Sequence, residues 1–255
     1  MHSLLPWSGS HGWLPLLWLV PAGLLAGAVN TAAGGGSFVT VAALLALGLP
    51  APVANASNRV GVLVQSAWGA GRFRARGVDG GGELWAQILV SGAGAGLGAA
   101  LSLWLDPKRF DQVLAVAMIV MLGVSLARPR SWLEPGRPRP VRWLALFAAG
   151  AYGGFLQAGV GVLLLPALVV FGGLDPVRAN ARKVLLVAAF TVPPLVMYAA
   201  AGLVDWLAGG VLALSSAVGA TLGVRLTVGY GPRFVYAVLV LVVVANLVRM
   251  VATSG

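Results

Sequence analysis

Cysteine is absent from the 255-residue chain, and its two histidines, His2 and His11, stand close to the N-terminus. The sequence therefore excludes disulfide bonds and thiolate chemistry, and it offers the body of the protein no histidine for metal binding or proton transfer. Charged residues are also scarce, at 9% of the chain, against about 25% in soluble globular domains. So few charges cannot cover the surface of a water-soluble globule of this length.

Long apolar runs take the place of those charges. Hydrophobic residues make up 59% of the chain, and apolar runs recur from Trp13 to Met250. In lipid, a closed bundle of helices is the only helical arrangement that satisfies the backbone polar groups of such runs. The 36 glycines and 15 prolines fit this class, because membrane helices tolerate both residues and use glycine for close packing. We therefore predict an all-α integral membrane protein with the lipid bilayer as its surroundings.

Basic residues outnumber acidic ones, 17 to 7. The resulting net charge of +10 would suit a nucleic-acid-binding protein, but the arginines stand between apolar segments, where the positive-inside rule accounts for them. We expect no nucleic-acid partner. Because residues 1–12 contain no lysine or arginine, we interpret the first apolar run as a membrane segment that follows an external N-terminus, and not as a cleaved signal peptide.

A repeat with a spacing of 125 residues organises the chain. Asn55 and Asn180 lie in the similar stretches 49–56 and 174–181, and 180 − 55 = 125. Matches at one ungapped spacing are typical of a duplicated structural unit. The same shift also pairs Gly34 with Gly159, Gly36 with Gly161, Gly48 with Gly173, Gly77 with Gly202, Gly94 with Gly219, Gly98 with Gly223, and Pro107-Lys108 with Pro232-Arg233.

Each half contains five apolar segments. We predict a first transmembrane repeat over 1–127, a cytoplasmic linker rich in arginine and proline over 128–142, and a second repeat over 143–255. An odd number of segments per half would invert the second copy, as in many secondary transporters. The segments are 13–33, 37–49, 55–71, 84–105 and 110–127 in the first half, and 143–158, 161–173, 183–200, 206–227 and 233–250 in the second.

The distribution of arginine supports inversion. The loop around 72–76 contains three arginines, whereas its repeat counterpart at 197–202 contains no basic residue. Equivalent loops with opposite charge are expected if one lies in the cytoplasm and the other outside. With the arginine-rich loop inside, the linker is also inside and both termini are outside.

Some of the segments are too short to cross a membrane. The segments 37–49, 143–158 and 161–173 would extend roughly 20–24 Å as helices, short of the ~30 Å hydrocarbon core. We therefore predict a broken or re-entrant helical hairpin in each half, with tips at 34–37 and 159–161. Irregular backbone at that depth has to line a polar cavity or be buried in protein.

The first tip, Gly34-Gly35-Gly36-Ser37, has the composition of an anion-binding turn. Glycine permits a positive φ, Ser37 could cap the helix that follows, and the exposed N–H groups and helix dipole would favour a negative charge. Tight helix packing is the alternative explanation for these glycines. We assign Gly94-x-x-x-Gly98 and Gly219-x-x-x-Gly223 to helix packing.

Polar residues at membrane depth supply the other candidates, because such groups are costly unless they face a cavity. Asparagine amides and basic side chains can donate hydrogen bonds to an oxyanion. Helix capping and interfacial anchoring are the alternative roles, and we assign Arg182 to anchoring. Gln65 is a further amide inside an apolar run. The predicted substrate-binding residues are Asn30, Thr31, Gly34, Gly35, Gly36, Ser37, Asn55, Asn58, Arg59, Gln157, Gly159, Gly161, Asn180 and Lys183.

At these residues the sequence resembles the sulfite exporter TauE/SafE family of membrane permeases, over about residues 20 to 250. Gln157 is a departure, since a small residue is expected beside the second tip, and this bears on the substrate. The first repeat of the family is matched by Ala32-Ala33-Gly34-Gly35-Gly36-Ser37, Gly48-Leu49-Pro50 and Ala54-Asn55-Ala56. The second is matched by Gly153-Gly154-Phe155, Gly159-Val160-Gly161, Pro166 and Ala179-Asn180-Ala181-Arg182-Lys183.

The resemblance implies a secondary transporter that exports sulfite or a small organosulfonate, such as sulfoacetate, across the bacterial inner membrane. An anion channel, or an importer of a different small organic anion, would use similar polar groups and stays open. As partners we expect a small anionic substrate and the bilayer, with a homodimer as the candidate assembly.

An intramembrane enzyme is the alternative from a different class. The sequence contains neither an H-E-x-x-H nor a G-x-S-x-G motif, and an intramembrane hydrolase would need such a motif or paired acids at depth. We therefore expect no catalysis and no cofactor. The acids near the ends of the apolar segments are Asp79, Glu83, Asp106, Asp111, Asp175 and Asp205.

Overall fold

The computed structural model describes residues 14–78, 82–127 and 130–253, with the backbone alone described over 230–253 and at a few positions before 134. Within these residues the regular structure is helical, which confirms the predicted all-α fold. His2, His11, Asp79, Arg128 and Pro129 lie outside the described residues. The helices are η2 Leu14–Trp18, α1 Leu19–Ala32, α2 Ser37–Ala46, α3 Ala51–Arg74, α4 Leu84–Trp104, α5 Pro107–Ala127, η3 Arg130–Leu133, α6 Val141–Leu156, α7 Val160–Val169, α8 Pro176–Ala200 and α9 Trp206–Thr253.

Four helical stretches among the described residues are long and apolar enough to cross a membrane: Leu14–Ala32, Leu84–Trp104, Pro176–Ala200 and Trp206–Gly229. Helix α3 has 24 residues, but its buried polar side chains, which include Asn55, Asn58 and Arg59, lower its hydropathy. It is long enough to cross a membrane, but it can do so only if those polar side chains face protein and not lipid.

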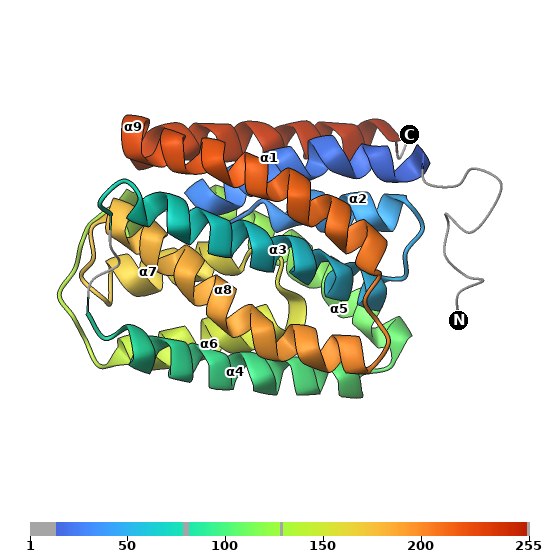
Figure 1. Ribbon diagram of the computed structural model, residues 1–255, viewed down its shortest axis with the longest axis horizontal. Helices are drawn as coiled ribbons and strands as arrows, with labels where there is room; N and C mark the ends of the chain where they lie inside the picture. Colours follow the sequence, from blue (N-terminus) through green and yellow to red (C-terminus); the bar gives the residue numbers. More distant parts are fainter. Residues whose placement is uncertain (1–13, 79–81, 128–129, 254–255) are drawn as a thin grey trace.

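The polar helices α3 and α8 cross in the middle of the molecule (Figure 1). Helices α1 and α9 pack together on the side of α3, and α4 and α6 pack together on the side of α8. This arrangement surrounds the polar faces of α3 and α8 with protein. The interior polar residues of the chain are thereby gathered at the centre.

The helix bounds repeat with the spacing seen in the sequence. Adding 125 to the bounds of α3 gives 176–199, and α8 extends over Pro176–Ala200. In Figure 1, α3 runs from right to left and α8 from left to right. Helices α1 and α6 also run in opposite directions. The two halves have the relative orientation that an inverted repeat requires, and its sidedness in the membrane stays a prediction.

Both predicted helix breaks are present. Helix α1 ends at Ala32 and α2 begins at Ser37, while α6 ends at Leu156 and α7 begins at Val160. Helices α2 and α7 have 10 residues each, which corresponds to about 15 Å, half the thickness of the hydrocarbon core. The helix pairs α1–α2 and α6–α7 therefore each turn back or stop inside the molecule.

The end of the chain differs from the prediction of two separate segments, 206–227 and 233–250. The backbone is helical without interruption from Trp206 to Thr253, although Figure 1 shows it turning back on itself at the end where α9 is labelled. Gly231 and Pro232 lie between the two predicted segments. Residues of these types bend a helix without ending it, so a break in the apolar pattern need not be a break in the helix.

The two G-x-x-x-G motifs serve helix packing, as predicted. A Cβ atom at Gly98 would overlap the carbonyl group of Ala151 on α6. A Cβ atom at Gly223 would overlap the carbonyl group of Ala28 on α1. The absence of a side chain thus allows the backbones of α4 and α6, and of α9 and α1, to touch.

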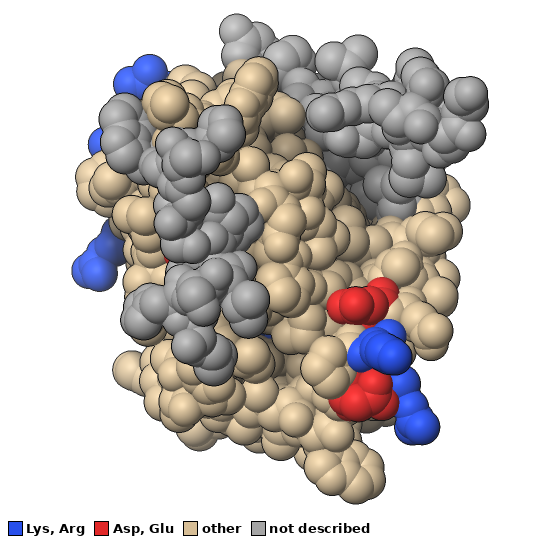
Figure 2. Space-filling model, turned by 90° about the vertical axis from the view of Figure 1, so that its right-hand side faces the viewer, with Lys and Arg blue, Asp and Glu red and all other residues tan. Residues whose placement is uncertain are grey.

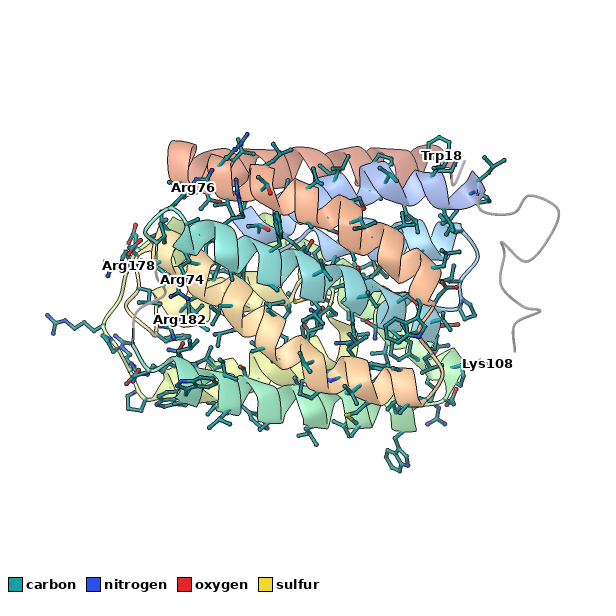
Figure 3. The ribbon with its side chains drawn as sticks, in the orientation of Figure 1. Trp18, Arg74, Arg76, Lys108, Arg178 and Arg182 are labelled. Carbon is teal, nitrogen blue, oxygen red and sulfur yellow. The ribbon has the colours of Figure 1, made fainter. Side chains whose placement is uncertain are left out.

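Basic side chains gather at one end of the bundle. Arg74, Arg76, Arg178 and Arg182 lie at the left end in Figure 3, and Lys108 lies at the right end. Figure 2 looks onto the right end and shows a mostly uncharged surface with a group in which acidic and basic side chains adjoin. This asymmetry supports a cytoplasmic position for the left end.

Two exposed alanines at opposite ends of the bundle test the inverted orientation. Ala75 follows α3 and Ala201 follows α8, where each is the C-terminal capping residue. Because the chain lacks cysteine, Ala75→Cys and Ala201→Cys each introduce a single thiol. In intact cells, a membrane-impermeant maleimide should label Ala201→Cys and leave Ala75→Cys unlabelled until the cells are broken. Equal labelling of both positions in intact cells would contradict the inversion.

Candidate functional site

The two helix breaks meet at the centre of the molecule. Gly34 in the first break and Gly159 in the second have φ values of +91° and +79°, which favour glycine over residues with side chains. Gly34 also touches Gly161, so closely that a Cβ atom on either one would overlap the backbone of the other. The tips of the two hairpins are thus in direct contact.

Asn30 holds the first break together. Its Nδ2 donates to the Ser37 hydroxyl oxygen at 2.9 Å, and its Oδ1 accepts from the Ser37 N–H at 3.3 Å. The prediction that Ser37 caps α2 is therefore wrong. Gly36 already has helical angles, with φ −64° and ψ −27°, so Ser37 lies inside the first turn, and the amide of Asn30 receives its N–H.

Lys183 on α8 hydrogen-bonds to the carbonyl groups at the end of α1. Its ammonium group donates to the carbonyl oxygen of Asn30 at 2.9 Å, to that of Thr31 at 3.3 Å, and to Asn180 Oδ1 at 2.7 Å. The last carbonyls of a helix carry partial negative charge and no intrahelical partner, so a cation stabilises them. An ammonium group carries three protons to donate, and these carbonyl and amide oxygens are all within hydrogen-bonding distance of it.

Arg59 on α3 hydrogen-bonds to the carbonyl groups at the end of α6. The guanidinium group donates to the carbonyl oxygens of Gly153 at 2.9 Å and Gly154 at 2.7 Å, and to Gln157 Oε1 at 2.8 Å. It also lies over the ring of Tyr198, 4.7 Å from the ring centroid. Arg59 is fully buried, and no acidic side chain among the described residues lies within ion-pairing distance of it. Helix carbonyls and an aromatic face therefore stabilise its charge.

The two arrangements are crossed between the halves of the chain. A basic residue of the second half holds the end of α1, and a basic residue of the first half holds the end of α6. Asn55 Nδ2 adds a hydrogen bond to the Phe155 carbonyl oxygen at 3.0 Å. Phe155 is the counterpart of Asn30, since 155 − 125 = 30. In both halves this carbonyl thus receives a donor from the opposite half.

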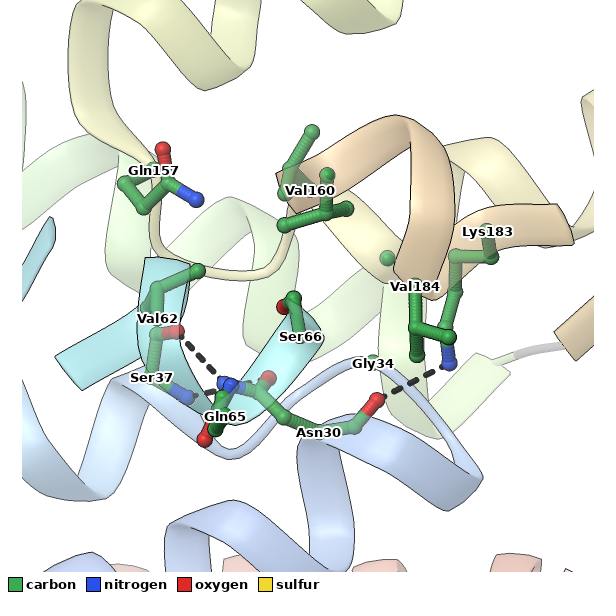
Figure 4. A pocket seen from close by; sticks show the side chains of 12 residues that line it. Asn30, Gly34, Ser37, Val62, Gln65, Ser66, Gln157, Val160, Lys183 and Val184 are labelled. Carbon is green, nitrogen blue, oxygen red and sulfur yellow. Dashed lines mark hydrogen bonds between the residues drawn. The ribbon is translucent and has the colours of Figure 1, made fainter. Parts of the chain in front are cut away.

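A small cavity of ≈ 20 Å³ lies where the two breaks meet (Figure 4). By the same measure about 10–15 Å³ holds one water molecule, so the cavity is large enough for one water, and a larger species such as an oxyanion fits only if the walls move apart. Its walls come from α1, α2, α3, α7, α8 and both helix breaks. They are Asn30, Gly34, Ser37, Val62, Gln65, Ser66, Gln157, Val160, Gly161, Lys183, Val184 and Val187.

The cavity brings together part of the predicted site. The predicted residues that line it are Asn30, Gly34, Ser37, Gln157, Gly161 and Lys183. Gly35, Gly36 and Gly159 complete the adjoining turns. Whether any of these residues binds a substrate stays a prediction.

Other predicted residues lie behind the cavity wall. Asn55, Arg59 and Asn180 contact the helix ends or their caps, and Asn58 Oδ1 accepts from the Thr40 hydroxyl at 2.6 Å. The Thr31 side chain faces Gly69 and Gly223. These side chains contact helix ends or neighbouring helices and are not among the residues that line the cavity.

Sequence reasoning missed two polar residues of the wall. Gln65 stood outside the predicted site and Ser66 was not singled out, yet both line the cavity. The signal was helical periodicity, because positions 58, 62 and 65–66 follow one face of α3. A search restricted to residues near the glycine tips does not reach that far along the helix.

The buried cap on α6 can be tested through stability. Arg59→Met removes three charge-assisted hydrogen bonds, and it also removes the cost of burying a charge. We expect the free energy of unfolding to fall by about 3 kcal/mol or more on balance. Thermal unfolding in detergent should show a melting temperature lower by about 6–12 °C. Arg178→Met is the control, because Arg178 pairs with Asp175 at the exposed surface and such pairs contribute less than about 1 kcal/mol. Similar melting temperatures for both variants would contradict the capping role.

Comparison with known proteins agrees with this architecture. The profile of the family described as "Sulfite exporter TauE/SafE" matches residues 19–250. The chain is 27% identical to "Probable membrane transporter protein YfcA" of Escherichia coli (strain K12) over 223 residues, which cover 86% of this chain and 83% of that protein. It is 25% identical to "Probable membrane transporter protein ORF9" of Sinorhizobium sp over 241 residues, 93% of this chain and 92% of that protein.

A third relative is the "Probable membrane transporter protein" of Haemophilus influenzae (strain ATCC 51907 / DSM 11121 / KW20 / Rd), 23% identical over 239 residues. The alignment covers 91% of this chain and 93% of that protein. No solved structure matches the chain. Because the family profile covers most of the sequence, this multi-pass bacterial membrane protein belongs to the sulfite exporter TauE/SafE family.

Proposed function

We propose that this membrane transporter exports a small sulfur-containing anion, sulfite or a short organosulfonate, which binds where the two helix breaks meet. The observation that carries the proposal is the cavity at the contact of Gly34 and Gly161. Its walls come from both halves of the chain, so a movement of one half against the other would change access from one side to the other.

The wall of the cavity favours a negative charge. Lys183 lines the cavity, and its ammonium group lies at the adjoining end of α1. The Ser37 hydroxyl oxygen accepts a hydrogen bond from Asn30, which leaves its own proton free to donate. The helix that starts at Ser37 directs the positive end of its dipole towards the first break. Together these groups offer charge and donors to a small oxyanion.

The membrane potential supplies the driving force in this proposal. Among the described residues that line the cavity there is no acidic side chain and no histidine, so the wall offers no proton relay of the usual kind. A negative-inside potential favours anion exit by about 2.3 kcal/mol per charge per 100 mV. For a monoanion this corresponds to a gradient of about fifty-fold, so export needs no coupled ion.

Flux into or out of proteoliposomes tests this function. With sulfite as substrate and a potassium–valinomycin potential, we expect saturable flux that follows the voltage while the pH is equal on both sides. Arg137→Ala in the linker is a control that should leave the flux unchanged, because Arg137 is exposed and does not line the cavity.

The other outcomes each contradict part of the proposal. Flux that ignores voltage and follows an imposed pH gradient would replace electrogenic export by proton-coupled transport. Flux that rises linearly with concentration, without saturation, would identify an anion channel. Transport of carboxylates without transport of sulfite or sulfoacetate would show that the protein carries a different organic anion.

A further inference from the structure

We propose that Gln157 makes the cavity selective for oxyanions, and that Arg59 is a positioning residue that determines which end of the Gln157 amide faces the cavity. This inference rests on the proposed transport of a small sulfur anion and adds a selectivity mechanism to it. Gln157 is a neutral residue that bridges the buried cation Arg59 and the cavity wall.

The contact with Arg59 fixes the orientation of the amide. A glutamine amide carries an acceptor oxygen and a donor nitrogen of nearly equal size, and a guanidinium group can only donate. Arg59 lies 2.8 Å from Gln157 Oε1, so the oxygen has to face Arg59 and the nitrogen has to face the other way. Both residues are fully buried.

The nitrogen end of the amide is therefore turned towards the cavity. Nε2 carries two protons, of which one is donated to the Thr191 hydroxyl oxygen at 3.3 Å. In Figure 4 the nitrogen of Gln157 points towards the other residues that line the cavity, and the oxygen points away from them. The second proton is thus available to an acceptor in the cavity.

The backbone at Gln157 supports a functional role. Gln157 has a φ of +54°, which is unfavourable for a residue with a side chain and is found where the surroundings enforce it, often at functional sites. Its counterpart in the first half is Ala32, since 157 − 125 = 32, and Ala32 is the last residue of α1. The second half therefore carries an amide where the first carries a methyl group.

The consequence is selectivity without a second charge in the cavity. Arg59 does not line the cavity, but through Gln157 it presents a fixed hydrogen-bond donor there. Such a wall favours a fully deprotonated oxyanion and disfavours cations and ligands that present a donor, because two opposed donors leave both groups unpaired.

Two substitutions of Gln157 separate this role from a structural one. Gln157→Glu keeps an acceptor for Arg59 and turns it into an ion pair, but it replaces the donor at the cavity by a carboxylate oxygen. Gln157→Met removes both groups at similar volume. We expect the Kd for sulfite to rise at least about tenfold in Gln157→Met and further in Gln157→Glu, although Gln157→Glu should have the higher melting temperature of the two.

Gln87→Glu is the matched control. Gln87 is buried on α4, and its Oε1 accepts from Arg182 at 3.2 Å, so the substitution puts the same carboxylate beside a buried arginine outside the cavity. The Kd for sulfite should stay within about twofold of the wild-type value in this variant, which is well below the effect of a lost charge-assisted hydrogen bond.

Calorimetric titration of the purified full-length protein with sulfite, together with thermal unfolding, decides among the outcomes. The inference is supported if Gln157→Glu binds sulfite more weakly than Gln157→Met although it has the higher melting temperature. Binding by Gln157→Glu equal to that of the wild type, or losses of affinity that follow the losses of stability, would overturn it and leave the proposed function intact. Wild-type protein that does not bind sulfite would overturn the proposed function, and this inference with it.

Discussion

A helix that stops inside a membrane leaves its last carbonyl groups without water, and the polar centre of this molecule is arranged around that constraint. Helices α1 and α6 both end at the centre of the bundle. Lys183 and Arg59, each from the opposite half of the chain, hydrogen-bond to those ends. The crossed caps explain why two long basic side chains are buried among apolar helices, and they tie the two halves together at the point where the tips touch.

The repeat and the breaks could be predicted because their signals are local. A spacing of 125 residues and the glycines at 34–36 and 159–161 place the helix ends to within a few residues. The cation that reaches each helix end could not be predicted, since a lysine or arginine side chain extends over several ångströms and its target depends on how helices cross. For the same reason Asn30 was not recognised as the partner of Ser37, and Ser66 was not recognised as part of the wall.

The two halves share a backbone arrangement and differ in chemistry. In the second half Lys183 both caps a helix and lines the cavity. In the first half Arg59 caps a helix and acts on the cavity only through Gln157. A substrate would therefore meet one cation and a set of oriented neutral donors, an environment that recognises an anion without holding it too tightly to be released.

The position of the bound anion is the most direct test of this account. Selenite has the shape and charge of sulfite, and its selenium atom can be located by anomalous diffraction. Crystals of the protein grown with selenite should show an anomalous peak in the cavity between Ser37, Gln157 and Lys183. A peak at the arginine-rich end of the bundle, with none between the helix breaks, would contradict the central claim that the breaks form the binding site.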